Sequence, residues 1–189
     1  TLPDRLEIEI NSSANITCRI NPSKFGGNVN SSSLYFEQED TKHIVPNDNI
    51  HILNDTTIVF MLRNATEQDR YYICKIGTKG IGITHVSVGT APLDITDFKC
   101  RGYDYTYMVC NFTKPHNVLL THYNLSYTAQ SPNYIQTCHL EMQQNQGICN
   151  LTMDKNNYRP NYEFYNFTLK GQNEVGVNVQ SFWINHYES

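Results

Sequence analysis

Residues 69–76 read Asp-Arg-Tyr-Tyr-Ile-Cys-Lys-Ile, with apolar side chains at positions 72, 74 and 76. Side chains two positions apart lie on the same face of an extended chain, so this spacing predicts a strand with one buried face. Cys18 stands at the centre of a similar triplet, between Ile16 and Ile20. Cys18 and Cys74 are therefore predicted to meet in the core of a β-sandwich and to form a disulfide between its two sheets.

The residues around Cys74 favour one kind of sandwich. Tyr72 precedes Cys74 by two positions, which is the place of the tyrosine corner in immunoglobulin domains. In those domains the paired cysteines lie on the second and the sixth strand, in opposite sheets. The tryptophan usual on the third strand is missing, and Phe36 is the best substitute. The first part of the chain is thus predicted to be an immunoglobulin-like domain.

Alternating apolar residues continue through the whole chain, whereas helical periodicity is poor. A short segment around Gly89 and Pro92 interrupts the pattern, and we expect a domain boundary there. The prediction is an all-β chain of two tandem β-sandwich domains, immunoglobulin-like in residues 1–91 and a second sandwich in residues 92–189. The expected strands are Leu6–Ile10, Ile16–Ile20, Leu34–Phe36, Ile50–Ile52, Ile58–Leu62, Tyr72–Ile76 and Thr84–Val88, then Ile95–Arg101, Tyr105–Thr113, His122–Ala129, Ile135–Glu141, Gly147–Met153, Tyr162–Lys170 and Val177–Asn185.

Asparagine usage indicates the secretory pathway. The chain has 22 asparagines, and nine of them begin an Asn-x-Ser/Thr sequon without a central proline. Such sequons receive glycans only during secretion, and glycosylated side chains must face water. The nine predicted glycosylation sites are Asn11, Asn15, Asn30, Asn54, Asn64, Asn111, Asn124, Asn150 and Asn166.

Four further cysteines lie in the second domain as two close pairs. Nine residues separate Cys100 from Cys110, and ten separate Cys138 from Cys149. Spacing of this kind is typical of disulfides that connect adjacent antiparallel strands, so we expect both pairs to be bonded. Zinc is the competing use of four cysteines, but there is no Cys-x-x-Cys motif, and an oxidising compartment favours disulfides.

These pairs resemble the N-terminal domain of the cytokine-binding module of class I cytokine receptors. That domain carries two consecutive disulfides, the first spaced like Cys100 and Cys110, with an aromatic residue two places after its second cysteine. The aromatic residue here is Phe112, where the family usually has tryptophan. Residues 165–176 also resemble the penultimate strand of a fibronectin type III domain and its Asn-x-x-Gly turn, which is Asn173 to Gly176. The resemblance implies that residues 92–189 are a fibronectin type III-like domain.

An immunoglobulin-like domain before such a module is the order found in the shared signal-transducing receptor of the interleukin-6 family. The resemblance implies an extracellular fragment that binds a helical-bundle cytokine, brings receptor chains together and promotes JAK/STAT-type signalling. It also implies a single membrane-spanning segment outside this fragment. The alternative is a cell-adhesion or co-receptor ectodomain, but ordinary fibronectin domains lack the two close disulfides. The Trp-Ser-x-Trp-Ser motif of the module's second half is absent from the chain.

Other function classes are disfavoured by composition. The net charge is −4, and no stretch has enough basic residues to contact a nucleic-acid phosphate backbone along its length. This argues against nucleic acid as a partner. The seven histidines are scattered, and no Gly-x-Ser-x-Gly elbow or phosphate loop occurs. We therefore predict a non-enzyme with no catalytic residues, no cofactor and no metal site.

Ligand contacts are predicted at two places. In the resembling family an exposed aromatic residue before the penultimate strand touches the cytokine, and counting back from Asn173 puts Tyr162 at that position, with Tyr158 nearby. In the first domain, residues 75–88 contain no sequon, and we expect a turn at Lys79–Gly82. Ile81 in that turn has no obvious core role, so it is a candidate contact residue. The simpler alternative is an isoleucine that packs against its own domain.

Overall fold

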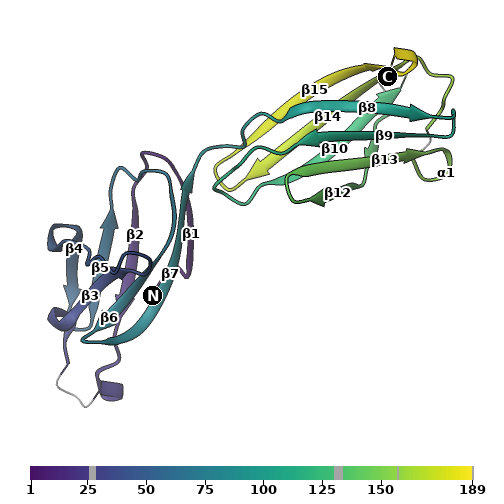
Figure 1. Ribbon diagram of the computed structural model, residues 1–189. Helices are drawn as coiled ribbons and strands as arrows, with labels where there is room; N and C mark the ends of the chain where they lie inside the picture. The colour runs from purple at the N-terminus through teal and green to yellow at the C-terminus, as the bar shows by residue number, and fades with distance from the viewer. Residues whose placement is uncertain (26–28, 130–133, 157, 189) are drawn as a thin grey trace. The chain divides into compact units, whose positions relative to one another are not determined.

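The computed structural model describes residues 1–25, 29–129, 134–156 and 158–188 (Figure 1). These residues form an all-β chain that divides into two compact units, Thr1–Thr90 and Ala91–Ser189. Ala91 belongs to the second unit, where the Cβ position of Gly176 would lie 2.7 Å from the Ala91 side chain. The division falls one residue before the expected boundary.

The first unit consists of two packed sheets. One sheet has the strand order β1-β7-β6-β3, and the other has the order β2-β5-β4. Strand β1 pairs in parallel with β7, and the other pairs are antiparallel. Their bounds are β1 Arg5–Glu9, β2 Ala14–Arg19, β3 Leu34–Gln38, β4 Ile50–Asn54, β5 Thr57–Leu62, β6 Gln68–Ile76 and β7 Lys79–Gly89, with 3₁₀ turns η1 Pro22–Phe25, η2 Ser31–Ser33 and η3 Asn47–Asn49.

A disulfide and an aromatic cluster fill the core of this unit. Cys18 on β2 is bonded to Cys74 on β6, so the bond joins the two sheets as the sequence predicts. Phe36 is fully buried on β3, and its ring lies 5.6 Å from that of Phe60. Tyr72 is also buried, and its hydroxyl donates to the Gln68 side chain at 3.0 Å. Phe36 thus fills the position expected for the missing tryptophan.

The hairpin between β6 and β7 differs from the expected one. The turn lies at Gly77 and Thr78, where Gly77 has φ +53°, rather than at Lys79–Gly82. Glycine enters this left-handed region without the steric cost that a Cβ brings, which explains why the chain reverses there. The expected turn residues therefore belong to β7.

The second unit also consists of two sheets, with the orders β11-β10-β14-β15 and β12-β13-β9-β8. The strands alternate buried and exposed residues, as a two-layer sandwich requires. None of the helices in the described ranges is long and apolar enough to cross a membrane. The bounds are β8 Thr96–Tyr103, β9 Tyr107–Thr113, β10 His122–Ala129, β11 Gln136–Cys138, β12 Leu140–Gln143, β13 Gln146–Thr152, β14 Phe164–Asn173 and β15 Gly176–Asn185, with α1 Met153–Asn156 and η4 His186–Glu188.

The strand expected at Ile135–Glu141 is wrong as a single element. The chain leaves one sheet after Cys138 and enters the other at Leu140, so β11 pairs with β10 whereas β12 pairs with β13. Apolar alternation reports which residues face the core, but it does not report which sheet they belong to. The break at His139 therefore left no trace in the pattern.

Candidate ligand-binding surface

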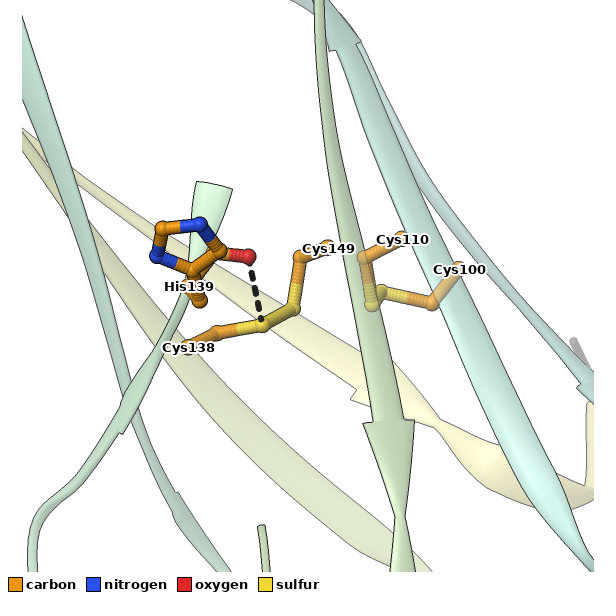
Figure 2. The surroundings of a disulfide bond; sticks show 5 residues. All are labelled: Cys100, Cys110, Cys138, His139 and Cys149. Carbon is orange, nitrogen blue, oxygen red and sulfur yellow. Dashed lines mark hydrogen bonds between the residues drawn. A yellow bond between two sulfur atoms is a disulfide. The ribbon is translucent and has the colours of Figure 1, made fainter. Parts of the chain in front are cut away.

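The two disulfides of the second unit lie next to each other in its core (Figure 2). Cys100, Cys110 and Cys149 occupy neighbouring positions across β8, β9 and β13. The Cys100–Cys110 bond connects adjacent strands, as expected, with Cα atoms 4.0 Å apart. The Cys138–Cys149 bond instead connects β11 in one sheet to β13 in the other. The second disulfide therefore fixes the sandwich rather than one hairpin.

Exposed tyrosines lie at one end of this unit, on segments that hydrogen bonds hold in place. Three segments meet there: the β8–β9 turn, the loop between α1 and β14, and η4. A hollow of about 440 Å³ opens between the first and the last of them. We call the following residues the tyrosine-rich end: Gly102, Asp104, Tyr105, Tyr162, His186 and Tyr187.

The β8–β9 turn presents Tyr105 to solvent. Asp104 has φ +47° and Tyr105 has φ +54°, and the amide of Thr106 donates to the carbonyl of Tyr103 at 2.9 Å. Two successive residues with positive φ are the mark of a tight hairpin turn, and asparagine and glycine are the usual residues there. A tyrosine in this conformation is uncommon, and 69% of Tyr105 remains exposed. The exposed turn residue was not predicted, because we expected a strand from Tyr105 onward.

Backbone and side-chain contacts hold η4 against the loop between α1 and β14. The amide of His186 donates to the carbonyl of Glu163 at 2.7 Å, and the Tyr187 hydroxyl donates to the carbonyl of Asn161 at 3.2 Å. Tyr162 lies between Asn161 and Glu163, whose carbonyls accept these two bonds, and its side chain packs partly against the core. The loop that carries Tyr162 is therefore positioned by the end of the chain.

The prediction that Tyr158 is an exposed contact residue is wrong. Its side chain is fully buried, its ring lies 6.1 Å from that of Tyr165, and its hydroxyl is 3.0 Å from His186 Nε2. Its backbone amide donates to the carbonyl of Thr152, the last residue of β13, at 3.2 Å, which holds this residue beside the core. Tyr158 supports the tyrosine-rich end from beneath.

His186 is a buried titratable side chain of the tyrosine-rich end. It is buried, and a Cβ on Gly102 would come within 2.6 Å of its ring, so the two elements approach closely. Burial lowers the pKa of His186, because the charged imidazolium loses its hydration. Burial likewise raises the pKa of Tyr127 to about 12. These groups are neutral near pH 7 and serve packing and hydrogen bonding.

The predicted contact residue of the first unit also finds a core role. Ile81 lies in β7, is partly buried and packs against the first core. This is the simpler alternative, an isoleucine that packs on its own domain. The exposed large apolar side chain on this strand is that of Ile83.

None of the nine sequon asparagines belongs to the tyrosine-rich end, although Asn166 lies four positions after Tyr162. Eight of the nine asparagines are exposed, and Asn166 is half-buried. In the second unit, Asn111 and Asn150 lie on one sheet, and Asn124 and Asn166 on the other. In the described parts of the chain, no group of three or more His, Cys, Asp or Glu residues could hold a metal ion.

Solved structures of other proteins share this fold. The chain matches the ectodomain of mouse nectin-like molecule 4 with a TM-score of 0.52 and 9% identity, over 97% of this chain and 66% of that one. It matches a structure of titin domains with a TM-score of 0.54 and 10% identity, over 96% and 61%. These matches show the fold alone, a tandem of β-sandwich domains.

One relative is much more similar to this chain in sequence than these structures are. A Drosophila melanogaster protein named cytokine receptor is 36% identical over 198 aligned positions, which cover 99% of this chain. The chain spans 15% of the length of that relative. No family model matches the chain. The chain is therefore homologous to a part of a cytokine receptor.

Proposed function

We propose that this chain is an extracellular ligand-binding part of a class I cytokine receptor and that it binds a helical-bundle cytokine. The observation that carries the proposal is the 36% identity to a cytokine receptor over 99% of the chain. The two disulfides in the second unit, Cys100–Cys110 and Cys138–Cys149, support it, because ordinary fibronectin domains lack them.

The tyrosine-rich end is the proposed contact surface. Tyr105 and Tyr187 are exposed, and tyrosine offers a large contact area at a low cost in side-chain entropy. None of the nine sequons begins in this surface, and the sequon at Asn166 begins four positions after Tyr162, on β14. Tyr162, the position suggested by the family resemblance, lies in the same surface.

A finer proposal concerns the partners. The resemblance extends to the insect receptor Domeless, and the cytokine would then be of the Unpaired type. Binding would bring receptor chains together on the outer side of the plasma membrane and start JAK/STAT-type signalling. We also propose that the sequons carry glycans and that the membrane anchor lies in another part of the parent receptor.

Single substitutions in the complete parent ectodomain test the contact surface. We expect Tyr105→Ala and Tyr162→Ala each to weaken cytokine binding, measured by surface plasmon resonance, while circular dichroism stays unchanged. Central aromatic contacts typically cost more than ~1 kcal/mol when truncated, which is about fivefold or more in affinity. Thr78→Ala, in the hairpin turn of the first unit, is the matched control. Unchanged affinity for both tyrosine variants would remove this end from the contact surface.

A cell-adhesion or co-receptor ectodomain is the second candidate. The fold match to a nectin-like ectodomain favours it, although at 9% identity that match shows the fold alone. An adhesion protein of this kind would bind another cell-surface sandwich. Cell-aggregation assays with the parent protein separate the two candidates, because a cytokine receptor should not cause cells to adhere.

A further inference from the structure

The sequon at Asn166 lies between two exposed aromatic side chains on the outer face of one sheet. Asn166 on β14 stands directly opposite Trp183 on the edge strand β15. Phe164 precedes Asn166 by two positions and shares its face of β14. Trp183 is 72% exposed and Phe164 is 48% exposed. The asparagine is thus flanked by one aromatic side chain across the ladder and one along its own strand.

These positions are close enough to form one site. Directly opposed residues have Cβ atoms about 4.5–5.5 Å apart, and residues two apart in a strand are about 7 Å apart. Phe164 and Trp183 are diagonal neighbours across the same ladder. Their rings therefore flank any group that extends from the Asn166 side chain.

The chemistry of the site fits a sugar. A pyranose ring has an apolar C–H face that packs on an aromatic ring, and hydroxyls at its rim that stay in water. A sugar attached to Asn166 is already at the site, so its contact with the rings costs no translational freedom.

Among the sequons that begin within a strand, an aromatic cross-strand neighbour is found at Asn166 alone within the described residues. The other five face aliphatic, thioether, charged or hydroxyl side chains. The pairs are Asn15 with Met61, Asn54 with Thr57, Asn111 with Ile148 and Lys99, Asn124 with Lys170, and Asn150 with Val109.

We propose that Asn166 carries an N-linked glycan whose first N-acetylglucosamine packs on Trp183 and Phe164. The glycan would cover apolar surface on β15, an edge strand that also exposes Val177 and Val179. An exposed apolar edge strand invites pairing with another chain, and a bulky polar cover prevents that pairing. The glycan is then part of how this domain stays monomeric.

Trp183 is the single tryptophan of the chain, so its fluorescence reports on this site alone. The experiment compares the chain secreted from insect cells with its Thr168→Ala variant, which destroys the sequon and leaves Asn166 in place. Peptide mass spectrometry measures occupancy. We expect Asn166 to be occupied, and Trp183 emission in the glycosylated chain to be blue-shifted and less quenched by acrylamide than in the variant.

Enzymatic trimming provides a second comparison that needs no mutation and so decides the matter even if Thr168→Ala misfolds. An endoglycosidase that leaves one N-acetylglucosamine should preserve the protected emission, whereas complete removal by peptide N-glycosidase should abolish it. Asn124→Gln is the control, because Asn124 lies on the same sheet face but opposite Lys170, and its loss should not change the emission. An unoccupied Asn166, or equal emission with and without its glycan, would overturn the proposal.

Discussion

At the scale of single residues, the second core depends on three buried tyrosines, of which Tyr158 was predicted from the sequence to be a contact residue. Tyr127, Tyr158 and Tyr165 are all buried to within 2%. The Tyr165 hydroxyl both donates to the carbonyl of Arg159, at 2.8 Å, and accepts from its amide, at 3.1 Å. The Tyr165 ring supplies apolar area to the core while its hydroxyl holds the loop before β14.

Tyr158→Ala is therefore expected to unfold the domain rather than to weaken binding selectively. Removing a buried aromatic ring costs about 3–5 kcal/mol, since a cavity remains and the partner of the hydroxyl is lost. Urea denaturation followed by circular dichroism measures the loss. Tyr105→Ala is the control and should stay within about 0.5 kcal/mol, because its side chain lies in solvent. Equal stability of the two variants would contradict the burial of Tyr158.

His186 is expected to make stability depend on pH. Its pKa in the folded chain lies below the ordinary value of 6.5, because burial disfavours the charged form. The unfolded chain then binds more protons than the folded chain between that lowered pKa and 6.5. Stability should be highest above pH 6.5 and should fall as the pH drops from 6.5 toward the folded-state pKa.

The measurement is thermal unfolding at a series of pH values for the parent chain and for His186→Gln. The variant cannot take up the proton, so its melting temperature should vary less across this window. The comparison uses the slope with pH rather than the absolute stability, because glutamine also alters packing. Identical slopes would assign the pH dependence to other groups.

At the scale of elements, the two close disulfides have different roles in the folded domain but close loops of nearly equal size. Their sequence separations are 10 and 11 residues. A disulfide stabilises mainly by restricting the unfolded chain, so loop length matters more than whether the bond lies within a sheet or between sheets. This distinction can be measured.

We expect the double variants Cys100→Ala with Cys110→Ala and Cys138→Ala with Cys149→Ala to lose similar stability, about 2–3 kcal/mol each. Alanine avoids placing a polar hydroxyl in the core. Chemical denaturation of the two variants beside the parent chain gives the values. A much larger loss for the Cys138–Cys149 variant would mean that the link between the sheets stabilises the folded state directly.

At the scale of the whole molecule, each unit has a hydrophobic core of its own. The buried clusters of the two units share no residue. A chain of residues 91–189 is therefore expected to fold alone and to unfold in one cooperative transition, as seen by calorimetry. Non-cooperative melting of this fragment would show that its fold needs residues 1–90.

Removing residues 1–90 from the parent receptor extends this test to function. In the family that the chain resembles, the first domain contributes to assembly rather than to first capture of the ligand. We expect cytokine binding by the shortened receptor to be largely intact and receptor assembly in cells to be lost. Normal signalling by the shortened receptor would contradict the assembly role.

The sequence by itself determined the features that depend on the alternation of apolar residues and on the spacing of the cysteines. Alternation around Cys74 and Cys18 predicted the strands, their buried faces and the disulfide between the sheets. The sequons agreed, because an outward asparagine such as Asn150 fixes its neighbours as inward. These predictions hold because the side-chain direction in a strand follows directly from residue order.

Only the tertiary structure decided which sheet a strand joins and which loop residues are exposed. The switch of sheets at His139, the burial of Tyr158 and the exposure of Tyr105 in its turn all depend on contacts between distant segments. The approach of Trp183 to Asn166 depends on the register of β14 and β15. No local pattern encodes such a register, because it is set by the packing of the two sheets and by the turns that join their strands.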